Sequence, residues 1–266
     1  MSTQTVSQRR TSRTPPLPTA TRRGLALLAG VLGCAAIYGG GSLLVSGIAH
    51  YQAQAFIEHW EKKPAVPTEQ AWLIAEDAIQ RAIAAYPASN GAYLETLGYI
   101  QQWRAFGAEL NDPAVQEYRQ NSLTALRAST QARPTWPDTW ASLVYAKLTV
   151  LEFDDEFTHA IQQAQHYGPW RIGINRRIAE VGLIAYAVLN AEQQALVSES
   201  IQRTARYSAK ERAKLFELAQ HSNSLNPLCQ MLVDAPEAAC APVQINSAYQ
   251  LPHNNAENNA EVAPAP

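Results

Sequence analysis

Apolar residues recur at every third or fourth position through most of this chain, which is the spacing that one face of an α-helix requires. The helical faces are separated by prolines and polar turns, and no alternating run of useful length predicts a strand. The pattern therefore predicts an all-α fold. Helices are expected over about 69–86, 92–105, 113–131, 137–148, 154–167, 171–188, 191–207 and 209–221.

The stretch from Arg133 to Trp170 looks like one complete helix-turn-helix repeat, because Pro134 and Pro169 bound it 35 residues apart. A period near 34 with Trp-x-x-Leu, small residues and a closing proline is typical of tetratricopeptide (TPR) repeats. Val144 and Lys147 depart from this pattern, which usually has Gly and Tyr there. The matching positions are Trp140, Leu143, Ala160, Ala164 and Pro169.

An earlier unit between Pro87 and Pro134 has the same character, with Leu94, Leu97 and Gly98 at signature positions. Together the two units predict helical-hairpin, TPR-like repeats. Repeats of this kind usually present surfaces to other proteins and seldom carry catalytic groups.

An uncharged, apolar run extends from Gly24 to Tyr51, with only His50 able to titrate. About 20 residues suffice to cross a bilayer core of about 30 Å, so the run predicts one transmembrane helix. Arginines that precede a span favour a cytoplasmic N-terminus and so place the rest of the chain in the periplasm of a bacterial inner-membrane protein. Five arginines precede the run, at positions 9, 10, 13, 22 and 23.

The expected organisation is therefore a disordered cytoplasmic tail (1–23), a transmembrane anchor (24–51), a periplasmic α-helical TPR-like domain (52–242) and a second disordered tail (243–266). Two alternatives to an uncleaved anchor stay open. Gly47-Ile48-Ala49 would suit cleavage of a signal peptide, and Val31 to Cys34 loosely resembles a lipoprotein box.

Small residues repeat every four positions in the anchor, at Ala26, Gly30 and Cys34, and could allow two such helices to pair as a homodimer. The remaining cysteines, Cys229 and Cys240, are expected to form a disulfide in an oxidising periplasm. A metal-binding pair is the weaker alternative, because no histidine or second Cys-x-x-Cys accompanies them.

Charge and motifs narrow the functional classes. After the N-terminal arginines the chain has more acidic than basic residues, which excludes nucleic acid as a partner. Asp154, Asp155 and Glu156 could suggest paired catalytic carboxylates, but acids at a helix start are better explained by its free N–H groups. His159 and His166 have no third ligand nearby in sequence. We expect no enzymatic activity, no metal and no cofactor.

The tryptophans are the remaining candidates for binding. Trp136, Trp140 and Trp170 could stack on the apolar faces of sugars, or they could fill the core between repeats. Trp140 lies on the face expected to be buried, so we assign it to the core. Trp136 and Trp170 flank turns and stay candidates for contact with a partner or a glycan.

The runs Arg133 to Leu143, Phe153 to Phe157 and Gly168 to Trp170 resemble those of VpsP-type polysaccharide biosynthesis proteins, a TPR-like family encoded in exopolysaccharide gene clusters of Gram-negative bacteria. The similarity extends over about residues 72–240 and implies a role in assembly or export of a surface polysaccharide. The first hypothesis is a non-catalytic, membrane-anchored periplasmic scaffold that holds polysaccharide polymerase or export proteins. The alternatives are a carbohydrate-binding module of the same pathway and a general periplasmic assembly factor.

Overall fold

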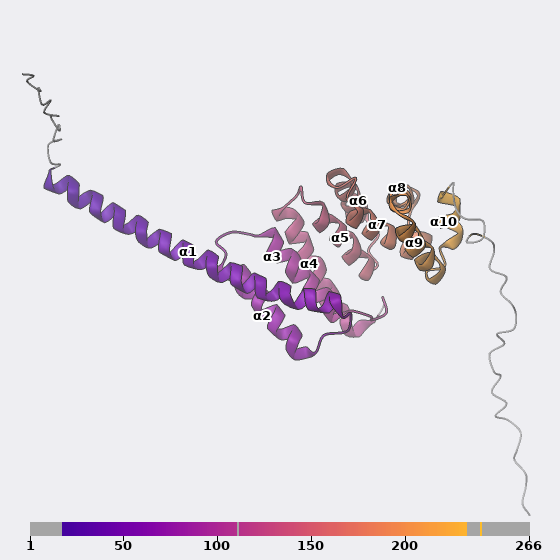
Figure 1. Ribbon diagram of the computed structural model, residues 1–266, viewed down its shortest axis with the longest axis horizontal. Helices are drawn as coiled ribbons and strands as arrows, with labels where there is room; N and C mark the ends of the chain where they lie inside the picture. Colours follow the sequence, from indigo (N-terminus) through magenta and orange to yellow (C-terminus); the bar gives the residue numbers. More distant parts are fainter. Residues whose placement is uncertain (1–17, 111, 233–239, 241–266) are drawn as a thin grey trace, which may run out of the picture.

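The protein is all-helical throughout the part of the chain that the computed structural model describes, residues 18–110, 112–232 and 240 (Figure 1). This confirms the all-α part of the predicted fold class. The tail 243–266 and most of the tail 1–23 lie outside the described residues. The α-helices are α1 Thr19–Lys62, α2 Glu69–Ala85, α3 Gly91–Arg104, α4 Gln116–Ala132, α5 Pro137–Thr149, α6 Asp155–Tyr167, α7 Ile172–Ala185, α8 Ala191–Tyr207, α9 Ala209–His221 and α10 Leu225–Met231.

The predicted helices from 69 to 221 correspond to α2 through α9, with boundaries that agree to within a few residues. Side-chain caps explain why the sequence was sufficient to predict where these helices begin. Asn90 and Asp154 each accept a hydrogen bond from a backbone N–H in the first turn of the helix that follows. Asn190 and Gln193 form a reciprocal capping box at the start of α8. The short helix α10 was not predicted.

The helices pack as successive hairpins, α3 with α4, α5 with α6, and α7 with α8. Along the stack, α5 also contacts α7 and α7 contacts α9, while α6 contacts α8. The odd-numbered helices therefore form one layer and the even-numbered helices the other. We call the outer surface of the first layer the odd-helix face.

Most of the repeat-signature residues lie inside this stack. Leu143, Ala160 and Ala164 are buried, and they belong to one apolar core that extends from α4 to α8. Trp140 is only partly buried: it packs against that core while its Nε1–H donates to the carbonyl of Pro134 at 2.7 Å. Pro169 lies in the turn between α6 and α7, where its carbonyl accepts hydrogen bonds from Asn175 and Arg203.

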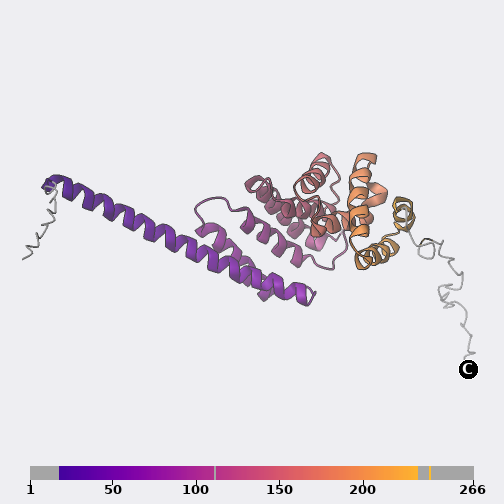
Figure 2. The same cartoon turned by 45° about the horizontal axis from the view of Figure 1, so that its top comes forward.

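One helix, α1, is long and apolar enough to cross a membrane. Its 44 residues would extend about 66 Å. The N-terminal part projects from the domain, and the C-terminal part lies along α2 (Figures 1 and 2). The helix begins at Thr19, so residues 19–23 belong to it and not to the expected tail, and it ends at Lys62, past the expected boundary at Tyr51.

The packed part of α1 explains why the helix continues. Buried residues recur at helical spacing and face α2, at Ser46, Ala49, Ala53, Ile57 and Trp60. The Ser46 hydroxyl donates to the carbonyl of Ala82 at 2.9 Å. Residues 42–51 therefore belong both to the apolar run and to the folded domain, so the domain begins earlier than residue 52.

Candidate functional site

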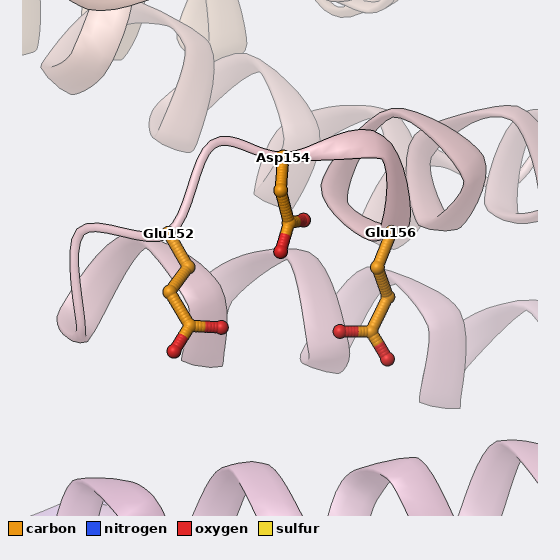
Figure 3. Close-up of side chains that lie close together, drawn as sticks. All are labelled: Glu152, Asp154 and Glu156. Carbon is orange, nitrogen blue, oxygen red and sulfur yellow. The ribbon is translucent and has the colours of Figure 1, made fainter.

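Three carboxylates converge at the turn between α5 and α6, from Glu152, Asp154 and Glu156 (Figure 3). One oxygen of each lies within 4.8 Å of the other two. The Nζ of the fully buried Lys147 lies 3.1 Å from Glu152, 2.9 Å from Asp154 and 2.7 Å from Glu156. Lys147 thus supplies the cation among these carboxylates, in the position that a metal ion would need.

Arg127 of α4 joins the same group, with its guanidinium 2.6 Å from Glu156 and 3.1 Å from Glu152. Its hydrogen bonds, followed by those of Lys147, hold the pKa of Glu156 below the usual range. Burial would lower the pKa of Lys147, but the hydrogen bonds that it donates to the three carboxylates outweigh it and raise that pKa. We call these five residues the Lys147 cluster. It ties α4, α5 and α6 together.

The cluster explains the acidic residues that the sequence drew attention to. Asp154 caps α6 by accepting a hydrogen bond from the N–H of Phe157 at 3.0 Å, which is the helix-start role expected for it. Lys147 was noted only as a departure from the repeat pattern. His159 packs edge-on against Trp140, and His166 packs against Tyr167.

The odd-helix face carries two cavities that adjoin each other. The larger, about 420 Å³, lies among α1, α3, α5, α7 and the segment 105–110, and the smaller, about 340 Å³, lies among α5, α7, α8 and α9. Tyr145 and Glu180 line both, so the cavities are neighbours along the layer with these two residues between them. No sequence motif marked this surface.

Aromatic rings form much of the wall of the larger cavity, from Tyr99, Trp103, Phe106 and Tyr145. The Trp103 and Phe106 rings pack 4.9 Å apart. Burial raises the pKa of Tyr99 and of Tyr145, so both phenols stay neutral and can donate hydrogen bonds. The wall therefore offers apolar surface with a few polar groups, as ligand sites commonly do.

Arg177 of α7 supplies a positive charge to this cavity. Its Nη1 donates to the Ser142 hydroxyl at 2.6 Å and to the Tyr99 hydroxyl at 3.3 Å. Both acceptors are neutral, and no carboxylate of the described residues lies within 4.0 Å of the guanidinium. Burial would lower the pKa of Arg177, but Tyr99 and the more distant carboxylates of Glu180 and Glu95 outweigh it and raise that pKa.

Further donors on the same wall are unused. The Nε of Arg119 and the Nε2 of Gln102 are buried and have no hydrogen-bond partner among the described residues. The other nitrogens of Arg119 donate to the carbonyls of residues 108, 109 and 110, which fixes the segment that borders the cavity. A buried donor without an acceptor costs free energy.

The smaller cavity is more aliphatic. Val181, Ile184, Leu215 and Leu218 line it beside the ion pair of Arg176 with Glu211, whose closest atoms are 2.7 Å apart. Glu180 lies between the two cavities. Burial raises the pKa of the Glu180 carboxyl, since the surrounding protein displaces the water that would solvate its charge.

The two candidate tryptophans lie at the turns that precede α5 and α7, away from these cavities. Trp136 is 43% exposed and lies beneath the guanidinium groups of Arg133 and Arg171, at 5.2 and 5.7 Å from the ring centre. Trp170 is 85% exposed, with Arg203 at 5.4 Å. Trp170 therefore offers a free ring face, whereas Trp136 is engaged by cations.

The expected disulfide is present between Cys229 of α10 and Cys240. Both residues pack against the core formed by α7, α8, α9 and α10. The bond thus attaches the segment after α10 to the last helices. Cys34 in α1 is exposed and carries a free thiol.

No known family model matches the chain, and no curated protein matches it in sequence. The functional argument therefore depends on the fold and on the odd-helix face. Sequence analysis missed Tyr99, Arg177 and Glu180 because each follows helical spacing without forming a local motif. The one available signal was an unpaired arginine beside the apolar stripe of α7, which includes Ile178 and Val181.

Proposed function

We propose that this protein is a non-catalytic scaffold anchored in a bacterial inner membrane by α1, with its helical domain in the periplasm. Its hairpins act as TPR-like repeats, and its odd-helix face binds an extended polypeptide segment of a partner. The observation that carries this proposal is the pair of neighbouring cavities over α1, α3, α5, α7 and α9, with Arg177, which makes no ion pair within 4.0 Å among the described residues, in the wall of the larger one.

Three features support the location. The apolar part of α1 is not buried by the domain, so its side chains are free to face lipid. Arginines precede it, and arginines on one side of a span favour the cytoplasmic side. A disulfide in the domain is compatible with an oxidising compartment such as the periplasm.

The packing of two helices within each hairpin supports the view that the hairpins are repeats of one structural unit. A Cβ at Gly98 of α3 would lie 2.8 Å from the Leu126 side chain of α4, and one at Gly182 of α7 would lie 2.5 Å from Val197 of α8. Both glycines lie in the first helix of a hairpin and admit a side chain of the second. This shared close approach argues that the hairpins are variants of one unit.

The cavities favour a polypeptide as the ligand. The aromatic and aliphatic walls suit apolar side chains along a chain, and Arg177 suits a carboxylate or a carbonyl. The resemblance to VpsP-type proteins suggests that the process is assembly or export of a surface polysaccharide. On that basis the partners are polymerase or export proteins of a surface polysaccharide.

Photocrosslinking in living cells tests the proposal. A photoreactive phenylalanine analogue replaces Phe106, which is 40% exposed in the larger cavity. The matched control replaces Tyr167, which is 39% exposed at the end of α6 and lines neither cavity. We expect crosslinks to polymerase or export proteins from position 106 and none from position 167. Equal crosslinking at both positions, or none at either, would contradict the proposal.

Carbohydrate binding is the second candidate, favoured by the free ring face of Trp170. Titration of the protein with the polysaccharide of the producing cell should then change tryptophan fluorescence, and Trp170→Ala should remove the change. Trp136→Ala is the matched control, because Trp136 is already covered by two arginines. An unchanged spectrum in the wild-type protein would eliminate this candidate.

A further inference from the structure

The end of the domain nearest the projecting part of α1 is made of two segments that pack together. These are residues 42–51 of α1 and residues 82–94, which end α2, form the following loop and begin α3. The Ser42 and Ser46 hydroxyls donate to the carbonyls of Ala85 and Ala82. The loop between α2 and α3 lies beside α1 (Figure 1). We call these two segments the tip.

The tip contains no aspartate, glutamate, lysine or arginine. Its one histidine, His50, is engaged by the protein, with Nε2 2.9 Å from the Thr96 hydroxyl and the ring packed at a tilt against Tyr93. Charged side chains resume directly beyond it, at Arg81 and at Glu95. A water-exposed end of a domain ordinarily carries charge, so an uncharged end needs another explanation.

The side of α1 that faces away from α2 stays apolar through the tip. Leu43, Leu44, Val45, Ile48 and Tyr51 are all exposed there. They continue without interruption from the apolar part of α1 that begins at Gly24. An exposed apolar surface of this kind marks contact with a partner or a membrane.

The length of the uncharged part of α1 favours a membrane over a protein as the contact. The residues from Gly24 to Tyr51 extend about 42 Å along a helix, which exceeds a hydrocarbon core of about 30 Å and matches about 40–45 Å for the core with its headgroup layers. The first 20 of these residues fill the core. The remaining residues, 44–51, to which α2 is already packed, extend about 12 Å, so they would cross the headgroup layer of about 5–8 Å and reach its outer surface.

We propose that the tip is inserted in the interfacial layer of the bilayer, so that the folded domain itself contacts lipid. This inference depends on the proposed membrane anchoring. Tyr51 and Tyr86 then lie at the depth where tyrosine is enriched in membrane proteins. Arg133, which packs against Gly91 of the tip, lies at headgroup level.

The consequence concerns the odd-helix face. Because α1 is one unbroken helix, insertion of the tip fixes the height of the domain above the membrane. The larger cavity includes Ile57 and Glu61, which lie about 9–15 Å along α1 beyond Tyr51. A partner segment that enters this cavity is therefore close to the bilayer, as a short periplasmic loop of an integral membrane protein would be.

Fluorophore labelling of the full chain in lipid vesicles tests the inference. One environment-sensitive label is attached at position 88 in Cys34→Ala/Ala88→Cys, and the control label is attached at position 65 in Cys34→Ala/Ala65→Cys. Both alanines are exposed in loops, at opposite ends of α2. The native Cys34 thiol, labelled in the wild-type chain, reports on the span itself.

We expect brominated lipid to reduce the fluorescence at position 88 and at Cys34, and aqueous iodide to reduce it only at position 65. Iodide quenching at position 88 with Cys34 protected would overturn the tip proposal and leave the anchor standing. Iodide quenching at Cys34 as well would overturn both. A label at position 88 that neither quencher reaches would show that a protein, and not lipid, covers the tip.

Discussion

Lys147 and Arg177 lie on the odd-numbered helices α5 and α7, and both cations are largely withdrawn from water, yet their surroundings differ completely. Lys147 has three carboxylates within 3.1 Å, and Arg127 completes the group. Arg177 has two neutral hydroxyls and lines a cavity. The first arrangement is complete without a ligand. The second still has capacity to bind one.

The different surroundings of Lys147 and Arg177 indicate which cation stabilises the fold and which one is a candidate for binding a ligand. Withdrawing a charge from water costs several kcal/mol unless opposite charges and hydrogen bonds compensate. In the Lys147 cluster the compensation is internal, so its role is to hold α4, α5 and α6 together. At Arg177 no carboxylate of the described residues lies within 4.0 Å, and the charge is compensated by two hydroxyls and by the more distant Glu180 and Glu95. Such a site gains free energy when an acceptor arrives.

The largest expected effect is on folding. Lys147→Met leaves three partly exposed carboxylates without the buried ammonium, so the free energy of unfolding should fall by about 2–3 kcal/mol. Urea denaturation of the detergent-solubilised protein measures it. The matched control is Lys210→Met, because Lys210 is exposed and makes no ion pair among the described residues. Equal effects of the two variants would remove the structural role of the cluster.

A smaller loss of stability is expected at the other cation. Arg177→Met removes two hydrogen bonds but no ion pair, and the Tyr99 and Ser142 hydroxyls can still bond to each other across 2.7 Å. The free energy of unfolding should fall by about 1–2 kcal/mol, measured in the same urea series. A loss as large as that of Lys147→Met would show that Arg177 is also structural, and the contrast between the two sites would disappear.

Acid should affect the two regions in opposite directions. The pKa values of Glu156 and Asp154 are lowered in the folded state, so the stability that they provide is present above their unfolded values and is lost as the pH falls below about 4. Unfolding free energies measured from pH 7 to pH 3 should therefore decline. Glu156→Gln should weaken this decline, and an unchanged decline would contradict the assignment.

The smallest effect is expected at Glu180. Its pKa is raised in the folded state, so its ionisation opposes folding as the pH rises above its unfolded value of about 4.5. Glu180→Gln should slightly raise the free energy of unfolding at pH 7, and the gain should disappear at pH 4. A loss of stability at pH 7 would show that the ionised carboxylate makes a favourable contact in the folded protein.

Sequence predicted the helices well because each has local determinants. Apolar periodicity, the prolines at 87, 134 and 169, and caps such as Asn90 are all properties of short segments. The contacts of Arg127 and Arg177 were not predictable in the same way. Arg127 and Glu156 are 29 residues apart, and Tyr99 and Arg177 are 78 apart, so their meeting depends on how the hairpins stack.

The extent of α1 shows another limit of sequence. The apolar run marked residues 24–51 as a span, and hydropathy alone does not reveal that its last part also packs against α2. Ser46 and Ala49 face α2, while Val45 and Ile48 face outward. The side of α1 that packs against α2 and the side that faces outward can be told apart only once the position of α2 is known.

The central claim is that the Arg177 cavity is the functional site, and production of matrix polysaccharide tests it most directly. A deletion strain is complemented with wild-type protein, Arg177→Met or the control Arg206→Met, an exposed arginine beyond both cavities, at matched levels of folded protein. We expect Arg177→Met to reduce matrix polysaccharide towards the deletion level and Arg206→Met to restore it. Full restoration by Arg177→Met would contradict the claim.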